Sequence, residues 1–83
     1  MEQLKILGLM VLEREKLASQ IQDIFTKYGC SIKTRLGLNE LDIPEVGNAG
    51  LIILELMGDK EECLRLENEL QALEGVKVRT MTF

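Results

Sequence analysis

The fold is decided by residues 49–58, which read AGLIILELMG. Side chains of a strand alternate between its two faces, and here both faces receive apolar residues, because Leu51 and Ile53 share one parity while Ile52 and Leu54 share the other. A strand with one face in water would alternate apolar and polar residues instead. We therefore expect a central strand that is covered on both sides.

A second central strand is expected at residues 4–12, LKILGLMVL, which are also apolar on both parities apart from Lys5. A helix is expected from Arg14, because apolar residues then recur at helical spacing along one stripe. That stripe consists of Leu17, Ile21, Ile24, Phe25 and Tyr28. Gly29 is expected to end this helix in the left-handed conformation.

Residues 31–38, SIKTRLGL, alternate in the manner of an edge strand with one wetter face. The next ten residues, 39–48, contain Asn39, Pro44 and Gly47 without helical periodicity, and they predict a long hairpin loop. This loop would connect the edge strand to the central strand at residues 49–58.

A second helix is expected to begin after Asp59, an N-cap residue followed three positions later by Glu62. Its buried stripe is predicted to be Cys63, Leu66, Leu70 and Leu73. Gly75 is expected to end the helix, and residues 76–83, VKVRTMTF, predict a terminal edge strand.

The element order is strand, helix, strand, strand, helix, strand. Right-handed crossovers in two βαβ halves place both helices on one face of a single sheet. We therefore predict an α+β fold, a ferredoxin-like βαββαβ sandwich with a four-stranded antiparallel sheet, which forms one domain over residues 1–83. The strands at residues 4–12 and 49–58 would lie in its middle.

The two helices can cover only one face of the central strand. Ile52, Leu54 and Leu56 are assigned to the helix-covered core. The other face would carry Leu51, Ile53 and Glu55, and an exposed apolar patch of this kind marks an interface. We therefore expect a homodimer or homotetramer that associates through these three residues.

Four basic residues of the edge strands, Lys33, Arg35, Lys77 and Arg79, are predicted to lie on the same open face. Two interpretations stay open. Charges on edge strands prevent unwanted strand pairing, and Glu55 would then neutralise Lys33 or Arg35. Alternatively, the charges form the basic rim of an oligomer interface that meets an acidic helix or an anionic ligand.

The net charge of −4 arises between residues 59 and 74, which contain six acids and two bases. This balance opposes direct nucleic-acid binding, which needs clustered Lys and Arg. The first residues, MEQLK, lack the features of a signal peptide, and no apolar run is long enough to span a membrane, so the expected location is cytoplasmic.

The sequence contains no histidine and no C-x-x-C motif, so we expect neither a metal site nor a cofactor. Cys30 and Cys63 are expected to be buried thiols, with a redox pair as the alternative. No catalytic motif is recognisable, and we expect that the protein is not an enzyme.

The sequence resembles the small bacterial family of iron-only hydrogenase system regulators, which are single ACT-like domains. The likeness covers nearly the whole chain and rests on residues 35–37 (RLG), 50–56 (GLIILEL) and 75–80 (GVKVRT), with Leu70 and Leu73. It implies an ACT-like fold, self-association and a regulatory role near hydrogenase maturation. It implies no particular ligand, because Glu13 and Arg14 stand where amino-acid-binding ACT modules carry asparagine and glycine.

These observations together predict a cytoplasmic regulatory module that acts as an oligomer and takes a small-molecule effector or a protein partner at the subunit boundary. The candidate ligand-binding residues are Arg14, Arg35, Gly37 and Arg79. The alternatives are a bare oligomerisation domain without a ligand and, in a different class, a small anion-handling enzyme.

Overall fold

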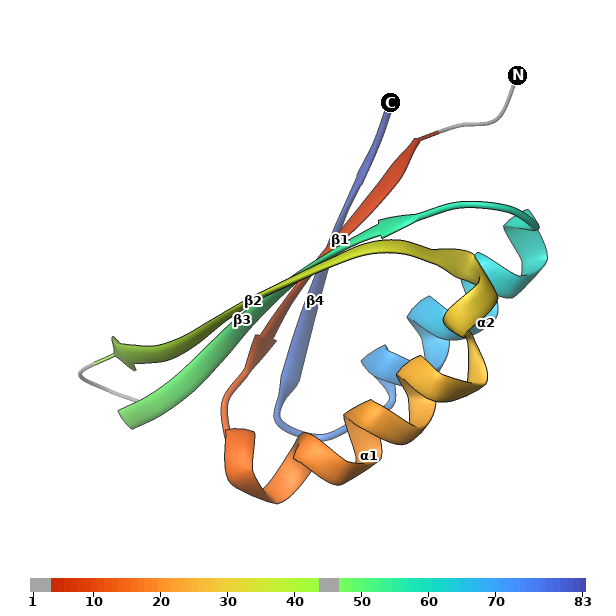
Figure 1. The fold of residues 1–83 in the computed structure, drawn as a ribbon. Helices are drawn as coiled ribbons and strands as arrows, with labels where there is room; N and C mark the ends of the chain where they lie inside the picture. The colour runs from red at the N-terminus through yellow and green to blue at the C-terminus, as the bar shows by residue number, and fades with distance from the viewer. Residues whose placement is uncertain (1–3, 44–46) are drawn as a thin grey trace.

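A computed structural model describes residues 4–43 and 47–83 of the chain. Its elements are β1 (Lys5–Val11), α1 (Arg14–Lys27), a 3-10 turn (Gly29–Ser31), β2 (Ile32–Ile43), β3 (Gly47–Leu56), α2 (Lys60–Gln71) and β4 (Val76–Thr82). The four strands form one antiparallel sheet in the order β2-β3-β1-β4, and both helices cover the same face of it (Figure 1). The predicted ferredoxin-like fold is confirmed.

The core forms between the helices and one parity of each strand. Leu54 and Leu7 are completely buried on the central strands, and Leu66 is completely buried on α2. Leu51, Ile53 and Glu55 lie on the opposite face of β3, as predicted from their parity, and each is only partly buried. We call this helix-free side of the sheet the open face.

The two helices begin and end partly as predicted. The Asp59 carboxylate accepts the backbone N–H of Glu61 at 2.9 Å and caps α2. α2 ends earlier than predicted, at Gln71 with Ala72 as its C-cap, so Leu73 lies beyond the helix. Gly75 instead has φ +91° in the turn before β4, where a Cβ would lie 3.2 Å from a Leu17 methyl group. The prediction for Gly29 is wrong, because the backbone N–H of Ser31 donates to the Tyr28 carbonyl and tightens the chain into a 3-10 turn without positive φ.

The predicted long loop at residues 39–48 is wrong for residues 39–43 and 47–48, whereas residues 44–46 lie outside the described part of the chain. β2 and β3 continue through most of it, with Leu41 opposite Ala49 and Ile43 opposite Gly47. The pairing register shifts between Leu38 and Leu41, so the polar residues between them are accommodated by an irregularity within the strand. Because β1 pairs with β3 only as far as Gly50, β2 and β3 extend as a two-stranded ribbon past β1 (Figure 1).

A second irregularity in β2 reverses the predicted facing of two side chains. The register moves from Ile32 opposite Leu56 to Thr34 opposite Glu55, so Lys33 is an extra residue in the strand. Thr34 consequently faces the open side, where its hydroxyl donates to Glu55 at 2.9 Å. Arg35, predicted on the open face, instead lies on the helix-covered side, while Lys33, Lys77 and Arg79 keep their predicted side.

The cysteine prediction holds for only one of the two residues. Cys63 is buried between α2 and the sheet, whereas Cys30 is exposed in the 3-10 turn. In this turn, which follows the end of α1, the Ser31 side chain is buried, whereas the preceding side chain, that of Cys30, is exposed to water.

Ion pairs and hydrogen bonds join α2 to the rest of the domain. Lys5 on β1 lies 2.7 Å from Glu67, and Thr80 donates to the same carboxylate at 2.9 Å. Burial opposes ionisation of Glu67, but these hydrogen bonds outweigh it and hold its pKa below the ordinary value of 4.5. At Glu69, hydrogen bonds from Tyr28 and then Lys27 lower the pKa in the same direction.

Replacing Leu54 by Ala should lower the free energy of unfolding by about 2–5 kcal/mol, because it removes a completely buried side chain and leaves a cavity. Leu64→Ala is the matched control, since Leu64 is 51% exposed on α2 and should change stability by less than about 0.5 kcal/mol. Urea denaturation measures both. Equal losses in the two variants would contradict the assignment of the core.

Acid should weaken the attachment of α2. A carboxylate whose pKa is lowered by folding stabilises the native state above its ordinary pKa, and this contribution is lost as pH falls from about 4.5 through the folded value. Glu67→Gln should therefore reduce the melting temperature at pH 7, and the difference from wild type should shrink toward pH 3. Glu74→Gln, on the exposed turn before β4, is the control. A pH-independent deficit in Glu67→Gln would contradict the ionic contribution.

Candidate functional site

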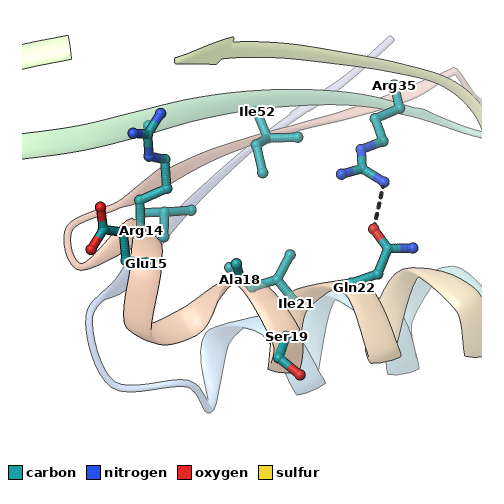
Figure 2. A pocket seen from close by; sticks show the side chains of 10 residues that line it. Arg14, Glu15, Ala18, Ser19, Ile21, Gln22, Arg35 and Ile52 are labelled. Atoms are coloured by element: carbon teal, nitrogen blue, oxygen red, sulfur yellow. Dashed lines mark hydrogen bonds between the residues drawn. The ribbon is translucent and has the colours of Figure 1, made fainter. Parts of the chain in front are cut away.

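A cleft of about 530 Å³ opens on the helix-covered side of the sheet, between α1 and strands β2 and β3 (Figure 2). It is lined by Val11, Arg14, Glu15, Ala18, Ser19, Ile21, Gln22, Arg35, Gly50 and Ile52. The cleft therefore combines an apolar wall with charged and amide groups.

The cleft exists because small residues stand where larger side chains would close the core. Ala18 and Ser19 line it from α1, and Gly50 lines it from β3. Gly37 lies beside it on β2, opposite Ile52, and a Cβ at Gly37 would meet no atom within 4 Å. The side chains of α1 and of the sheet therefore do not pack closely against each other along the cleft.

Arg35 is held in position by two contacts with α1. Its guanidinium lies 4.7 Å from the centroid of the Phe25 ring, and its Nη1 donates to Gln22 Oε1 at 3.1 Å (Figure 2). Stacking on an aromatic ring and one amide hydrogen bond fix the planar group but leave its other N–H donors available. The side chain is therefore preorganised to receive an acceptor from the cleft.

Arg14 is the first residue of α1 and reaches from the helix toward the strands, while Arg35 reaches from the strand toward the helix. Figure 2 shows the two arginines at opposite ends of the cleft, with Ile52 and Ile21 between them. Among the described residues, the ion pairs include neither arginine.

Glu15 lies beside Arg14 and is the carboxylate among the lining residues. Two guanidiniums and one carboxylate leave the cleft with a net positive charge. Such a set binds an anionic group, and Glu15 can in addition accept a hydrogen bond from a hydroxyl or amino group of the same ligand.

The structure brings together three of the four predicted ligand-binding residues. Arg14 and Arg35 line the cleft, and Gly37 borders it on β2. Arg79 lies apart from them on the open face of β4, where its Nη1 donates to the carbonyl of Val78 at 3.0 Å. Arg79 therefore cannot act at the same site within one copy of the chain.

Sequence reasoning missed Gln22 and the apolar wall formed by Ile21 and Ile52. Gln22 precedes Phe25 by one helical turn, a spacing that places the amide and the ring on neighbouring parts of α1. The spacing of Gln22 and Phe25 indicates a site only once Arg35 is known to lie on the helix-covered side of β2. The irregularity at Lys33 places it there.

A smaller hollow of about 210 Å³ lies at the other end of the sheet, beside the beginning of α2. Its Lys5 is already engaged by Glu67, so its cationic character is partly neutralised. In the part of the chain that the structure describes, no group of three or more His, Cys, Asp or Glu side chains could hold a metal ion. No helix there has the length and apolar character needed to cross a membrane.

Solved structures resemble the chain over nearly its whole length. An uncharacterized protein from Thermotoga maritima is 28% identical, with a TM-score of 0.81 and 99% of each chain covered. The apo form of CPII from Thiomonas intermedia, a nitrogen regulatory PII-like protein, is 16% identical, with a TM-score of 0.65, and the match covers 99% of this chain and 92% of that one.

CPII bound to ADP, AMP and bicarbonate also matches, at 17% identity and a TM-score of 0.64, over 99% of this chain and 91% of that one. The similarity to CPII shows a shared ferredoxin-like fold. A scan of protein-family models found no match, and a search of curated proteins found none either.

Proposed function

We propose that the protein is a non-catalytic regulatory module that binds an anionic small molecule in the cleft between α1 and β2–β3. The observation that carries this proposal is the pair of arginines, Arg14 and Arg35, which face one cavity without an ion-pair partner among the described residues. Unneutralised guanidiniums at a partly enclosed, apolar-walled site favour an anion over water.

The lining residues favour binding over catalysis. Arginine stays protonated and does not serve as a general base at neutral pH, so general acid–base chemistry in the cleft would depend on Glu15 among its charged residues. General acid–base chemistry usually pairs two titratable groups with different pKa values. One carboxylate beside two fixed cations supports a receptor that binds its ligand without changing it chemically.

The shape of the cleft indicates the type of ligand. Arg35 at one end can form a bidentate contact with a phosphate or carboxylate, and Ile21 and Ile52 offer an apolar surface to the ligand's body. Adenine nucleotides combine these properties, and CPII, with the same fold, has been solved with ADP and AMP. They are therefore the first ligands to test.

The proposal extends to a regulatory target, the iron-only hydrogenase system. The resemblance of residues 35–37, 50–56 and 75–80 to iron-only hydrogenase system regulators supports a cytoplasmic role near hydrogenase maturation, exerted as an oligomer on a protein partner and not on DNA. A net charge of −4 is consistent with that choice of partner. Loss of the gene should then lower the level of active iron-only hydrogenase in the host, and an unchanged level would contradict this role.

Ligand binding can be tested by thermal shift and isothermal titration calorimetry with ADP, AMP, ATP, inorganic phosphate and small dicarboxylates. A ligand that binds only the native state raises the melting temperature by mass action. Arg35→Gln and Arg14→Gln should each weaken binding by about tenfold or more, since each removes a charge-assisted hydrogen bond. Ala18→Leu should also weaken it by filling the cleft without changing charge.

Arg79→Gln is the matched control, because it makes the same substitution on the opposite face of the sheet. It should leave affinity within about twofold of wild type, since distant sites act independently. Equal losses in Arg79→Gln and Arg35→Gln would show that binding follows net charge and not this cleft. Absence of binding to every anion in the set would leave the bare oligomerisation domain as the better description.

A further inference from the structure

The open face of the sheet carries an apolar centre in the part of the chain that the structure describes. Ile6, Gly8 and Met10 occupy it on β1, and Leu51 and Ile53 occupy it on β3. At its margins, Leu36 on β2 is 54% exposed and Met81 on β4 is 56% exposed. A group of apolar side chains on the uncovered face of two central strands is typical of a surface that another protein covers.

The surface at the centre of this face is self-complementary in shape. Gly8 and Ile53 are directly opposite each other in the pairing of β1 with β3. Gly8 leaves a depression, since a Cβ built there meets no atom within 4 Å, and the adjacent Ile53 projects as a branched side chain. A projection beside a depression allows two copies of the same surface to interlock.

We infer that a second copy of this chain packs sheet to sheet on the open face, about a two-fold axis parallel to the strands and between β1 and β3. This rotation places β3 of each copy over β1 of the other in the same row. The partner's Ile53 then enters the depression at Gly8, and the reciprocal contact forms by symmetry. In the next row, the partner's Leu51 lies over Met10.

The geometry of packed sheets fits this arrangement. Aligned sheets pack about 10 Å apart with strands rotated by roughly 30°, and that rotation displaces the edges more than the centre. The contact between Gly8 and Ile53 lies next to the axis, so the twist of the sheets preserves it. The contact at the centre therefore determines whether two copies fit.

The distribution of charge selects this axis. Lys77 and Arg79 both lie on the open face of β4. A two-fold axis perpendicular to the strands would place β4 over β4 and bring four cations together. The parallel axis instead places β4 over β2 of the other copy, where Arg79 comes diagonally opposite the partner's Glu55. Of the two cations on β4, Arg79 then approaches a carboxylate, which Lys33 and Thr34 also contact within its own chain.

The acidic helix α2 of another copy fits the open face less well. Its Glu67 and Glu69 already contact Lys5 and Lys27 within the same chain. Its exposed side is polar around Leu64, so it would leave the apolar centre of the sheet uncovered. A second sheet provides both the apolar contact and the charge.

Self-association of the full chain can be measured by sedimentation for wild type, Gly8→Ile, Ile53→Ala and the double variant. Gly8→Ile fills the depression and should raise the dissociation constant of the dimer by about tenfold or more. The new isoleucine would overlap with the partner's Ile53. Ile53→Ala should weaken it by leaving cavities. The double variant recreates the fit with the two roles exchanged, and it should return to within about threefold of wild type.

Mixing the two single variants provides a second measurement. In a mixed dimer, Ile53 of the Gly8→Ile chain meets the unchanged Gly8 of the other chain, and the two substituted positions meet each other as an exchanged pair. Native mass spectrometry should therefore show more mixed dimer than either homodimer. Circular dichroism should show that each variant is folded, since both positions lie outside the helix-covered core. A monomeric wild type at micromolar concentration, an unaffected Gly8→Ile dimer, or a double variant weaker than both singles would overturn the inference.

This inference deepens the oligomeric part of the proposed function, and the two can fail separately. The cleft lies on the opposite side of the sheet from Gly8 and Ile53. Anion binding measured on Gly8→Ile therefore reports on the cleft alone, while sedimentation without ligand reports on the open face alone.

Discussion

The strict alternation of side chains along the strands is the constraint on which the rest of this structure depends. Two helices cover one face of a four-stranded sheet, so each strand residue is assigned either to the core or to the open face. Leu54 is buried for this reason, whereas Ile53, its neighbour in the chain, remains available for association. One extra residue in a strand reverses the assignment of every residue beyond it.

The irregularity at Lys33 is such an extra residue, and it creates the candidate site. It turns Arg35 from the open face to the side where Phe25 and Gln22 can hold its guanidinium. It also leaves Lys33 and Thr34 together opposite Glu55, so the carboxylate on the open face has partners from its own sheet. A small change in backbone register thus separates the candidate ligand site on one face from the proposed association surface on the other.

Most of the fold could be predicted because it depends on periodic patterns. The stripe of Leu17, Ile21 and Phe25 defines α1, and the two-sided apolar runs define the central strands. The irregularities in β2 leave no periodic pattern in the sequence. Polar residues can pair through their backbone in a strand, and one extra lysine hardly changes the composition of the strand. Residues 39–43 therefore resembled a loop, although they belong to β2 and residues 41–43 pair with β3. Arg14 and Arg35 line one cleft, and Gly37 pairs with Ile52 beside it, but the cleft itself, left open by Ala18 and Gly50, required the three-dimensional packing.

The position of Arg35 on the helix-covered face, in the cleft, can be measured in solution. Nuclear Overhauser contacts report which protons lie within about 5 Å of the arginine side chain, a range that includes directly packed side chains. Contacts are expected between the δ-methylene protons of Arg35 and the ring protons of Phe25. Contacts from Arg35 to Ile53 on the open face, with none to Phe25, would contradict this position.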